Sequence, residues 1–489
     1  MIPGISVWGT FVFIIILSIF QPIWAIYFII VFDLYWLVRI SYLLSFTFMG
    51  YLRFKKDVRV DWLTRCKSLI IWEEMYHLIF IPTFQEPLEV LHEVLEGICK
   101  SNYPLKKFIV VLGGEEADKG NFSSYARSLV GEYHGKFSEM LVTVHPAHLV
   151  GEIPGKGSNL AWAGRQAQNF IDSKNIPYEH VIVTSLDADT VVHPQYFSYL
   201  TYRYLTHPAP TRTSFQPIPL FNNNVWETHA FSRVISYSTT FWLMAEQLRP
   251  ERLSTFSSHS MSFTALVDVG FWQSDIVTED SRIGLQGIMH YDGEYQIEPM
   301  YIPLSMDIVS GKTIWQTIKS QYKQQRRWAY GIENFPWMVW NFGSNKQIPF
   351  MKKFRYIFNQ LEGVYSWATA PIVIFIVGRL PLWMANRGID LPAVTQNVPL
   401  ILKWLMTAST IGILLSAILG ATLLPPRPRN ATKWKYLMMV LQWAFLPFTL
   451  ILFGSVPATD AVTRLMLGKY LGFEVTKKMR KNSAVPGEG

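Results

Sequence analysis

The sequence predicts an α/β domain inserted between α-helical transmembrane segments. Two observations lead to this fold class. Long apolar stretches lie near both ends of the chain, and strand and helix patterns alternate between them. Half of the 489 residues are hydrophobic, 18 are tryptophan, and the mean hydropathy is +0.16. Such a chain is too apolar for an ordinary soluble protein of this length, yet its middle part is too polar to be buried in a membrane.

The first apolar stretch covers residues 5–50, where the only charged residues are Asp33 and Arg39. One spanning helix needs about 20 apolar residues, so segment 1–50 is expected to form two transmembrane helices with a break at Gln21-Pro22. The stretch is too long for a cleaved signal peptide and has no small-residue cleavage site, so we expect it to be retained.

Three further apolar stretches, 356–378, 398–424 and 436–457, predict more transmembrane segments within 356–460. Three complete crossings would place the basic tail on the other side of the membrane from the central domain. Pro447 and Pro457 favour instead a broken element that returns the chain to the same side. The remaining residues, 461–489, are expected to form an interfacial helix, a loop and a disordered end.

The formal net charge of +8 comes from lysines and arginines that lie beside the apolar stretches. Such residues mark the cytoplasmic flanks of membrane helices, so the charge predicts topology rather than nucleic-acid binding. The central residues, 51–355, are therefore expected in the cytoplasm, and the protein in the plasma membrane or an equivalent bilayer. Only two cysteines occur, Cys66 and Cys99, which excludes a disulfide framework. The basic residues are Arg53, Lys55, Lys56, Arg59, Lys352, Lys353, Arg355, Arg427, Arg429, Lys433, Lys435, Lys477, Lys478, Arg480 and Lys481.

Within the central region, residues 51–312 alternate between strand and helix patterns, whereas 313–355 are typical of amphipathic helices at the membrane surface. This alternation predicts a doubly wound α/β domain, whose ligands bind beyond the carboxyl ends of the strands. Asp187 and Asp189 directly follow the last of these strands and are expected at that edge. The expected strands are 76–84, 107–112, 140–144 and 181–185, and the expected helices are 87–100 and 158–172.

Three short motifs follow one another along the chain: Asp187-Ala188-Asp189, Thr278-Glu279-Asp280 and Gln324-Gln325-Arg326-Arg327-Trp328. Each motif alone is weak. Together they fit one chemistry, because a carboxylate pair can hold a divalent metal on a diphosphate and a later carboxylate can act as a base. An arginine beside a tryptophan can then bind the leaving group.

These motifs, with Pro82-Thr83-Phe84-Gln85-Glu86 and residues 155–160 (GKGSNL), resemble those of family 2 glycosyltransferases. The likeness covers about residues 78–328 and is greatest to the cellulose synthase, hyaluronan synthase and ceramide glucosyltransferase branch. It implies an α/β nucleotide-sugar (GT-A-like) domain and an inverting transfer from a UDP-sugar, most simply UDP-glucose or a related hexose. The tail also resembles a gating loop (FxVTxK), at Phe473, Val475, Thr476 and Lys477.

The resemblance assigns Asp189 and Asp187 to Mg²⁺ or Mn²⁺, a hard cation that suits carboxylate ligands and neutralises a diphosphate. Asp189 is the expected direct ligand, and Asp187 faces the ribose or lies just behind the ion. The alternative is that both are ordinary loop acids. The residues expected to bind the nucleotide sugar are Thr83, Glu86, Glu115, Lys156, Asp187, Gln324, Arg327 and Trp328.

Asp280 is the expected catalytic base, which takes the proton of the acceptor hydroxyl, and Glu279 either orients it or is a solvated neighbour. An acid that complements a helix dipole is the alternative for Asp280, and both readings can hold together. Arg327 offers a planar charged fork to phosphate oxygens. The alternative for Arg327 is that it belongs to a run of basic residues that contacts lipid headgroups, beside tryptophans of the aromatic belt at the membrane interface.

Two places depart from the family pattern. Relatives carry a pair of acids that contact uracil at the position of Gly113-Gly114-Glu115-Glu116 in this chain. Glu115 is the candidate to replace that contact. Residues 256–260 stand at the usual acceptor loop. Phe256, His259 and Trp328 are therefore candidates for acceptor binding, although His259 can equally fill a buried polar position.

Three functions compete: extension and export of a polysaccharide, synthesis of a glycolipid, and nucleotide binding by a non-catalytic transport or scaffold protein. The complete set of Asp189, Asp280 and Arg327 weighs against the third. The gating-loop resemblance and the several membrane segments favour a polysaccharide acceptor over a lipid acceptor.

Overall fold

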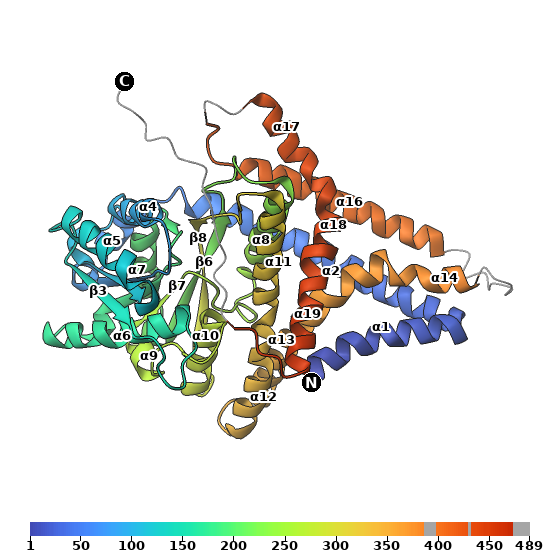
Figure 1. Ribbon diagram of the computed structural model, residues 1–489, viewed down its shortest axis with the longest axis horizontal. Helices are drawn as coiled ribbons and strands as arrows, with labels where there is room; N and C mark the ends of the chain where they lie inside the picture. The colour runs from blue at the N-terminus through green and yellow to red at the C-terminus, as the bar shows by residue number, and fades with distance from the viewer. Residues whose placement is uncertain (386–397, 429–431, 473–489) are drawn as a thin grey trace.

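The computed structural model describes residues 1–385, 398–428 and 432–472, and the statements below concern these residues. An α/β domain lies on one side of the molecule and a group of apolar helices on the other (Figure 1). The long helix α2 (Pro22–Asp57) connects the two parts, since it begins among the apolar helices and ends beside the sheet.

The α/β domain is built on an eight-stranded mixed sheet with the order β3-β2-β1-β4-β7-β6-β8-β5. Its first four strands are parallel, as the alternating pattern predicts. Strands β1, β2 and β4 are almost continuously buried because helices cover both of their faces. The four strands are β1 (Tyr76–Pro82), β2 (Phe108–Glu115), β3 (Glu139–His145) and β4 (Val181–Ser185).

The second half of the sheet differs from a doubly wound pattern. Strand β7 (His259–Ser262) is antiparallel to both β4 and β6 (Thr213–Phe221), whereas β8 (Gln296–Met306) is parallel to β6. Strand β5 (Val191–Val192) pairs antiparallel with β8. None of β5 to β8 was among the predicted strands. Strands β5 and β7, of two and four residues, are too short to establish a periodic pattern, whereas β6 and β8 are long but contain internal prolines, which argue against a strand.

Two hydrophobic cores hold helices against the two faces of the sheet. Helix α4 (Leu88–Cys99) buries Leu91, Val94, Leu95 and Ile98, the helical spacing seen in the sequence. Helices α5 (Lys119–Glu132) and α7 (Tyr196–Thr206) share this core, whereas the other face packs against α6 (Lys156–Ser173), α9 (Phe263–Asp268) and α10 (Glu279–His290).

Three helices among the described residues are long and apolar enough to cross a membrane: α1 (Ile2–Phe20), α2, and the run Trp434–Met466. A fourth candidate is α13 (Phe350–Phe375) with the helical residues up to Met384, bent by 43°. The break expected at Gln21-Pro22 is present, and Pro22 begins α2. Other helices of this part are η7 (Val377–Arg379), α14 (Leu380–Ala385) and α16 (Val398–Thr422).

The last apolar run is interrupted by tighter and wider helical turns. Pro447 and Pro457 are the second residues of α18 and α19, which directly follow the tighter turn η8 and the π-helical η9, and the run stays helical through both prolines. In Figure 1 the run passes across α2 and α16 rather than alongside them. It consists of α17 (Lys433–Leu441), η8 (Gln442–Phe445), α18 (Leu446–Thr449), the π-helical η9 (Leu450–Ser455) and α19 (Val456–Met466).

Helix α19 packs against α1 and against α11 (Ile314–Ala329), a helix that is followed by η6 (Tyr330–Glu333) and α12 (Asn334–Ser344). Trp8 Nε1 donates to Thr463 Oγ1 at 2.9 Å. The start of the chain and the end of α19 therefore lie side by side, next to the α/β domain (Figure 1).

Candidate active site

A cavity of about 1060 Å³ connects the carboxyl ends of the central strands with the apolar helices. Its α/β part is lined by side chains from all the sequence motifs, and its other part by residues of α2, α13, α16 and the run from α18 into η9. The motif residues that line it are Thr83, Glu86, Glu115, Lys156, Asp187, Asp189, Phe256, Glu279, Asp280, Gln324, Arg327 and Trp328.

Lys156 joins two of the motifs. It begins α6, and its Nζ donates to Asp187 Oδ1 at 2.6 Å and to Asp280 Oδ1 at 2.9 Å. Burial opposes the charge of Lys156, but the two carboxylates more than compensate and raise its pKa above the usual value. Burial also raises the pKa of Asp280, despite the ammonium beside it. The sequence pointed to each residue separately, and the structure places them in direct contact.

Asp187 and Asp189 are held by different partners. Asp187 Oδ2 accepts from Ser257 Oγ at 2.5 Å, and its amide donates to Ser258 Oγ at 3.0 Å. Asp189 is only 3% exposed, and its Oδ2 accepts from the amide of Asp307 at 3.0 Å. Asp187 is thus oriented by the loop that leads into β7, and Asp189 by the residue that follows β8.

Asp307 is a site residue that the sequence analysis missed. It directly follows β8, is buried, and its Oδ1 accepts from Asn223 Nδ2 at 3.0 Å. The same amide group donates to the carbonyl of Asp189, also at 3.0 Å. An acid directly after a strand was the signal used for Asp187, but β8 was not among the predicted strands, so this signal did not lead to Asp307.

The donors present fit a divalent cation of the hard type. Asp187 and Asp189 offer only carboxylate oxygens at the wall of the cavity, which is the ligand chemistry of Mg²⁺ and Mn²⁺. The Lys156 ammonium, 2.6 Å from Asp187, already shows that this position favours positive charge. Asp189 and Asp187 are the residues that would hold the ion.

Glu279 and Asp280 are the first two residues of α10, where acids complement the helix dipole. Glu279 is 3% exposed, and burial together with the charge of Asp280 raises its pKa. The preceding Thr278 donates from Oγ1 to Glu333 Oε1 at 2.5 Å, which fixes the motif against η6. Asp280 also lines the cavity, so its position at the helix N-terminus and its access to the cavity are compatible.

The adjacent arginines of α11, Arg326 and Arg327, have different neighbours. Arg327 lines the cavity with Gln324 and Trp328. Arg326 instead donates from Nη1 to Asp460 Oδ2 of α19 at 3.0 Å. The indole of Trp328 packs edge-on against Phe256, with ring centroids 5.6 Å apart. One face of the motif thus meets the cavity and another face fastens α11 to α19.

Glu115 ends β2 and is held by a histidine that the sequence analysis did not single out. His145 Nδ1 lies 2.8 Å from Glu115 Oε2, and His145 Nε2 lies 2.8 Å from Glu152 Oε2. Because ionised carboxylates only accept hydrogen bonds, both ring nitrogens must donate and His145 carries a positive charge. Burial opposes this charge, but the two glutamates raise the pKa of His145 above its usual value.

His259 is 1% exposed and is absent from the lining of the cavity, although Phe256 lies there. Burial lowers the pKa of His259 to about 4, so its imidazole is neutral. The gating-loop residues Phe473, Val475, Thr476 and Lys477 lie outside the described residues.

His145→Gln is expected to lower the melting temperature (Tm) more at pH 6 than at pH 9. Since the folded-state pKa of His145 is raised, the stabilisation is complete below its usual value of 6.5 and is lost as pH rises through the folded-state value. Charge-assisted hydrogen bonds of this kind contribute about 1.5–3 kcal/mol each. Thermal unfolding of the detergent-solubilised protein measures the effect. Exposed His134→Gln is the matched control, and an equal loss at both pH values would contradict the charged His145.

Comparison with known proteins identifies the family. The sequence pattern of the family described as "Glycosyl transferase family group 2" matches residues 182–456, more than half of the chain. That of "Glycosyltransferase like family 2" matches residues 77–248. The chain therefore belongs to glycosyltransferase family 2. The predicted fold class, a nucleotide-sugar (GT-A-like) α/β domain between apolar helices, is confirmed.

Two solved structures are similar in fold. Mannosyltransferase PcManGT from Pyrobaculum calidifontis, in complex with GDP-Man and Mn²⁺, is 17% identical with a TM-score of 0.44, covering 78% of this chain and 98% of that chain. Residues 1–349 of TarS from S. aureus, in complex with UDP-GlcNAc, are 12% identical with a TM-score of 0.38, covering 85% and 98%. No match was found among curated proteins.

Proposed function

We propose that this glycosyltransferase transfers a hexose from a UDP-sugar, with inversion, to a growing polysaccharide at the cytoplasmic face of a membrane. The observation that carries the proposal is the cavity, which begins at the motif carboxylates and continues among the apolar helices. A sugar added at Asp280 thus has a continuous path into the membrane part. The cellulose synthase and hyaluronan synthase branch is the part of the family that this arrangement favours.

The positive groups of the site are arranged to bind the donor diphosphate. Arg327 and Lys156 belong to different motifs and line the same cavity. Lys156 lies within hydrogen-bonding distance of both Asp187 and Asp280. When bound at Asp189 and Asp187, Mg²⁺ or Mn²⁺ would neutralise the diphosphate charge. Asp280 would take the proton of the attacking hydroxyl, and Arg327 would stabilise the departing UDP.

Polar groups in the membrane part of the cavity support a carbohydrate path. Arg39 of α2 lines the cavity and pairs with Glu362 of α13, and Arg252 of the α/β domain lies 3.3 Å from the same carboxylate, so these charges gather where the cavity enters the apolar helices. Ionisable groups at membrane depth are costly and typically mark the route of a polar substrate. Trp36 and Trp367 line this part as well and offer flat faces to sugar rings.

A glycolipid product is the second candidate function. It is supported by apolar side chains deep in the same cavity, among them Leu43, Ile374, Phe375 and Leu450, which would suit a lipid tail. In that case one sugar is transferred and the product leaves sideways into the bilayer.

The proposed topology places residues 51–312 in the cytoplasm, with 313–355 on the membrane surface and 1–50 and 356–460 in the membrane. It is supported by the basic residues that flank the apolar helices. Because Trp8 contacts Thr463, the start of the chain and the end of α19 share one side, which supports a cytoplasmic tail. The membrane is the plasma membrane or its equivalent.

The deciding experiment incubates purified protein with UDP-glucose, UDP-GlcNAc or GDP-mannose, with and without a lipid extract, and analyses product size and linkage. A polymer made from a UDP-sugar supports the proposal. A single sugar on lipid supports the second candidate. Absence of any transfer, with nucleotide still bound, would favour the non-catalytic alternative.

Removal of divalent metal is expected to stop transfer, and Mg²⁺ or Mn²⁺ should restore it. The reason is that Asp189 and Asp187 then face the diphosphate without a neutralising ion. Initial rates after EDTA treatment and re-addition of each metal measure the effect. Ca²⁺, a larger ion with looser coordination, is the control for nonspecific charge screening. Full activity in chelated enzyme would mean that the two carboxylates serve another purpose.

A further inference from the structure

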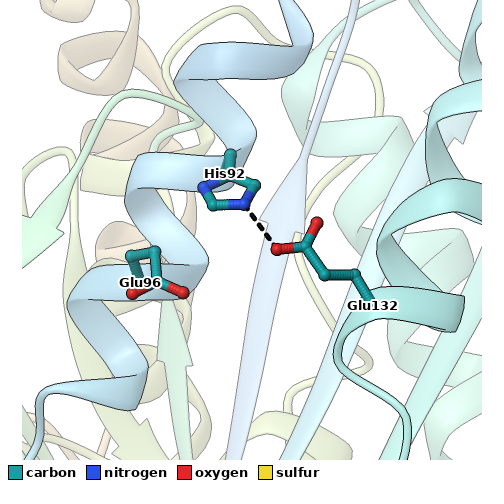
Figure 2. Close-up of side chains that lie close together, drawn as sticks. All are labelled: His92, Glu96 and Glu132. Atoms are coloured by element: carbon teal, nitrogen blue, oxygen red, sulfur yellow. Dashed lines mark hydrogen bonds and ion pairs between the residues drawn. The ribbon is translucent and has the colours of Figure 1, made fainter. Parts of the chain in front are cut away.

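A second group of metal-ligand side chains lies on the outer surface of the α/β domain. His92 and Glu96 are four residues apart on α4 and therefore share one face of that helix, and Glu132 is the last residue of α5 (Figure 2). One ligand atom from each residue lies within 4.8 Å of the other two. None of the three lines the catalytic cavity.

The geometry of the group suits a single small ion. His92 Nε2 lies 2.6 Å from Glu132 Oε1, and the dashed line in Figure 2 marks this contact. Two ligands of one Zn²⁺ ion are at most about 4.2 Å apart, because Zn–N and Zn–O distances are about 2.0–2.1 Å. Around a tetrahedral ion the ligand atoms lie about 3.3 Å apart, so a separation of 4.8 Å has to close by about 1.5 Å, which a rotation of a glutamate side chain provides.

A neighbouring tyrosine already orients one of the ligands. Tyr133 donates from its hydroxyl to Glu96 Oε1 at 2.9 Å, and the hydroxyl lies 3.4 Å from His92 Nε2. Its ring is buried, so the hydroxyl is held in place. Hydrogen bonds of this kind to ligating carboxylates are typical of metal sites.

The charge balance around the group is unfavourable without a cation. Glu96 and Glu132 both lie in the last turn of their helices, where the helix dipole disfavours negative charge, and neither last turn contains a basic residue. Among the described residues, neither glutamate forms an ion pair with a lysine or arginine. The ammonium of Lys136 lies over the Tyr133 ring, 4.3 Å from its centroid.

We propose that His92, Glu96 and Glu132 form a structural site for a divalent transition metal, Zn²⁺ by preference, that joins α4 to α5. One imidazole and two carboxylates are the ligand types of zinc, and water completes the four-coordinate ion. Binding replaces the hydrogen bond between His92 and Glu132 by two metal–ligand bonds, and His92 coordinates through Nε2 as a neutral imidazole that carries its proton on Nδ1. The ion stabilises two helices over one core of the sheet and takes no part in sugar transfer.

The test uses the metal-free full-length protein in detergent, with excess Mg²⁺ present to occupy the catalytic carboxylates. Zn²⁺ is titrated by calorimetry, and Tm is recorded with and without it. The wild type should bind one equivalent that His92→Ala and Glu132→Gln lose. At a Zn²⁺ concentration 100 times Kd, Tm should rise by roughly 3 °C in the wild type only.

Two further variants make the result specific. Glu89→Gln removes an exposed acid from the first turn of the same helix and should keep the Zn²⁺ equivalent. Tyr133→Phe keeps all three ligands and should weaken binding by about 10–100-fold. The proposal is overturned if the wild type takes up no Zn²⁺ equivalent, or if His92→Ala and Glu132→Gln retain it.

Discussion

Asp280→Asn is expected to lower kcat by roughly 10²- to 10⁴-fold, the range that general-base catalysis contributes. An amide cannot take the acceptor proton, yet it has the same shape as the carboxylate and keeps a hydrogen-bonding oxygen for Lys156. UDP affinity should therefore stay nearly unchanged, because the base acts only in the transition state. Initial rates at saturating donor and calorimetric UDP binding measure the two effects separately.

Two variants of other acids make this result interpretable. Asp189→Ala should also stop transfer, but through loss of metal-dependent UDP binding. Asp275→Asn changes an exposed acid five positions before Asp280. Because the Asp275 side chain does not line the cavity, this variant should leave kcat unchanged. Since burial raises the pKa of Asp280, wild-type activity should fall as pH drops through a value above the usual carboxyl range. Wild-type turnover in Asp280→Asn would remove Asp280 from the role of base.

The parts of the fold that were predictable are those with a long repeating pattern. Strand β4 matches its predicted range, and α4 differs from its prediction by one residue at each end, because continuous burial and helical spacing appear directly in the sequence. The long strands β6 and β8 were missed because internal prolines interrupt their patterns, and the antiparallel strands β5 and β7 left no such pattern. Their direction is set by long-range pairing with β8, β4 and β6, which no local signal records.

The candidate site, like the fold, contains residues that the sequence identified and residues that it did not. The motif acids, Lys156 and Arg327 were identified from order along the chain, and the structure gathers them around one cavity. The partners that hold them were not identified. Ser257, which binds Asp187, lies in the 256–260 loop that was noted only for acceptor binding, and His145, which binds Glu115, ends β3 and belongs to no motif. Such contacts depend on tertiary packing, so a single sequence does not reveal them.

Arg327→Ala is expected to reduce kcat by roughly 100- to 1,000-fold, or about 2.7–4 kcal/mol of transition-state stabilisation. Negative charge grows on the leaving UDP as the sugar bond breaks, and Arg327 faces the cavity in which that charge develops. The loss should appear mainly in kcat, with a smaller change in KM. Arg327→Lys should recover only part of the rate, because a single ammonium cannot make the paired contact of a guanidinium.

The neighbouring arginine provides the control that separates catalysis from membrane attachment. Arg326 is bound to Asp460 of α19, so Arg326→Ala should lower Tm while leaving kcat within a few-fold of wild type. The same assays report the stereochemical outcome. Asp280 as base, with no protein nucleophile among the motifs, requires a single displacement, so a UDP-α-sugar should give a β-linked product. An α-linked product would contradict single displacement. An Arg327→Ala enzyme as active as Arg326→Ala would assign Arg327 to lipid headgroups instead of the leaving group.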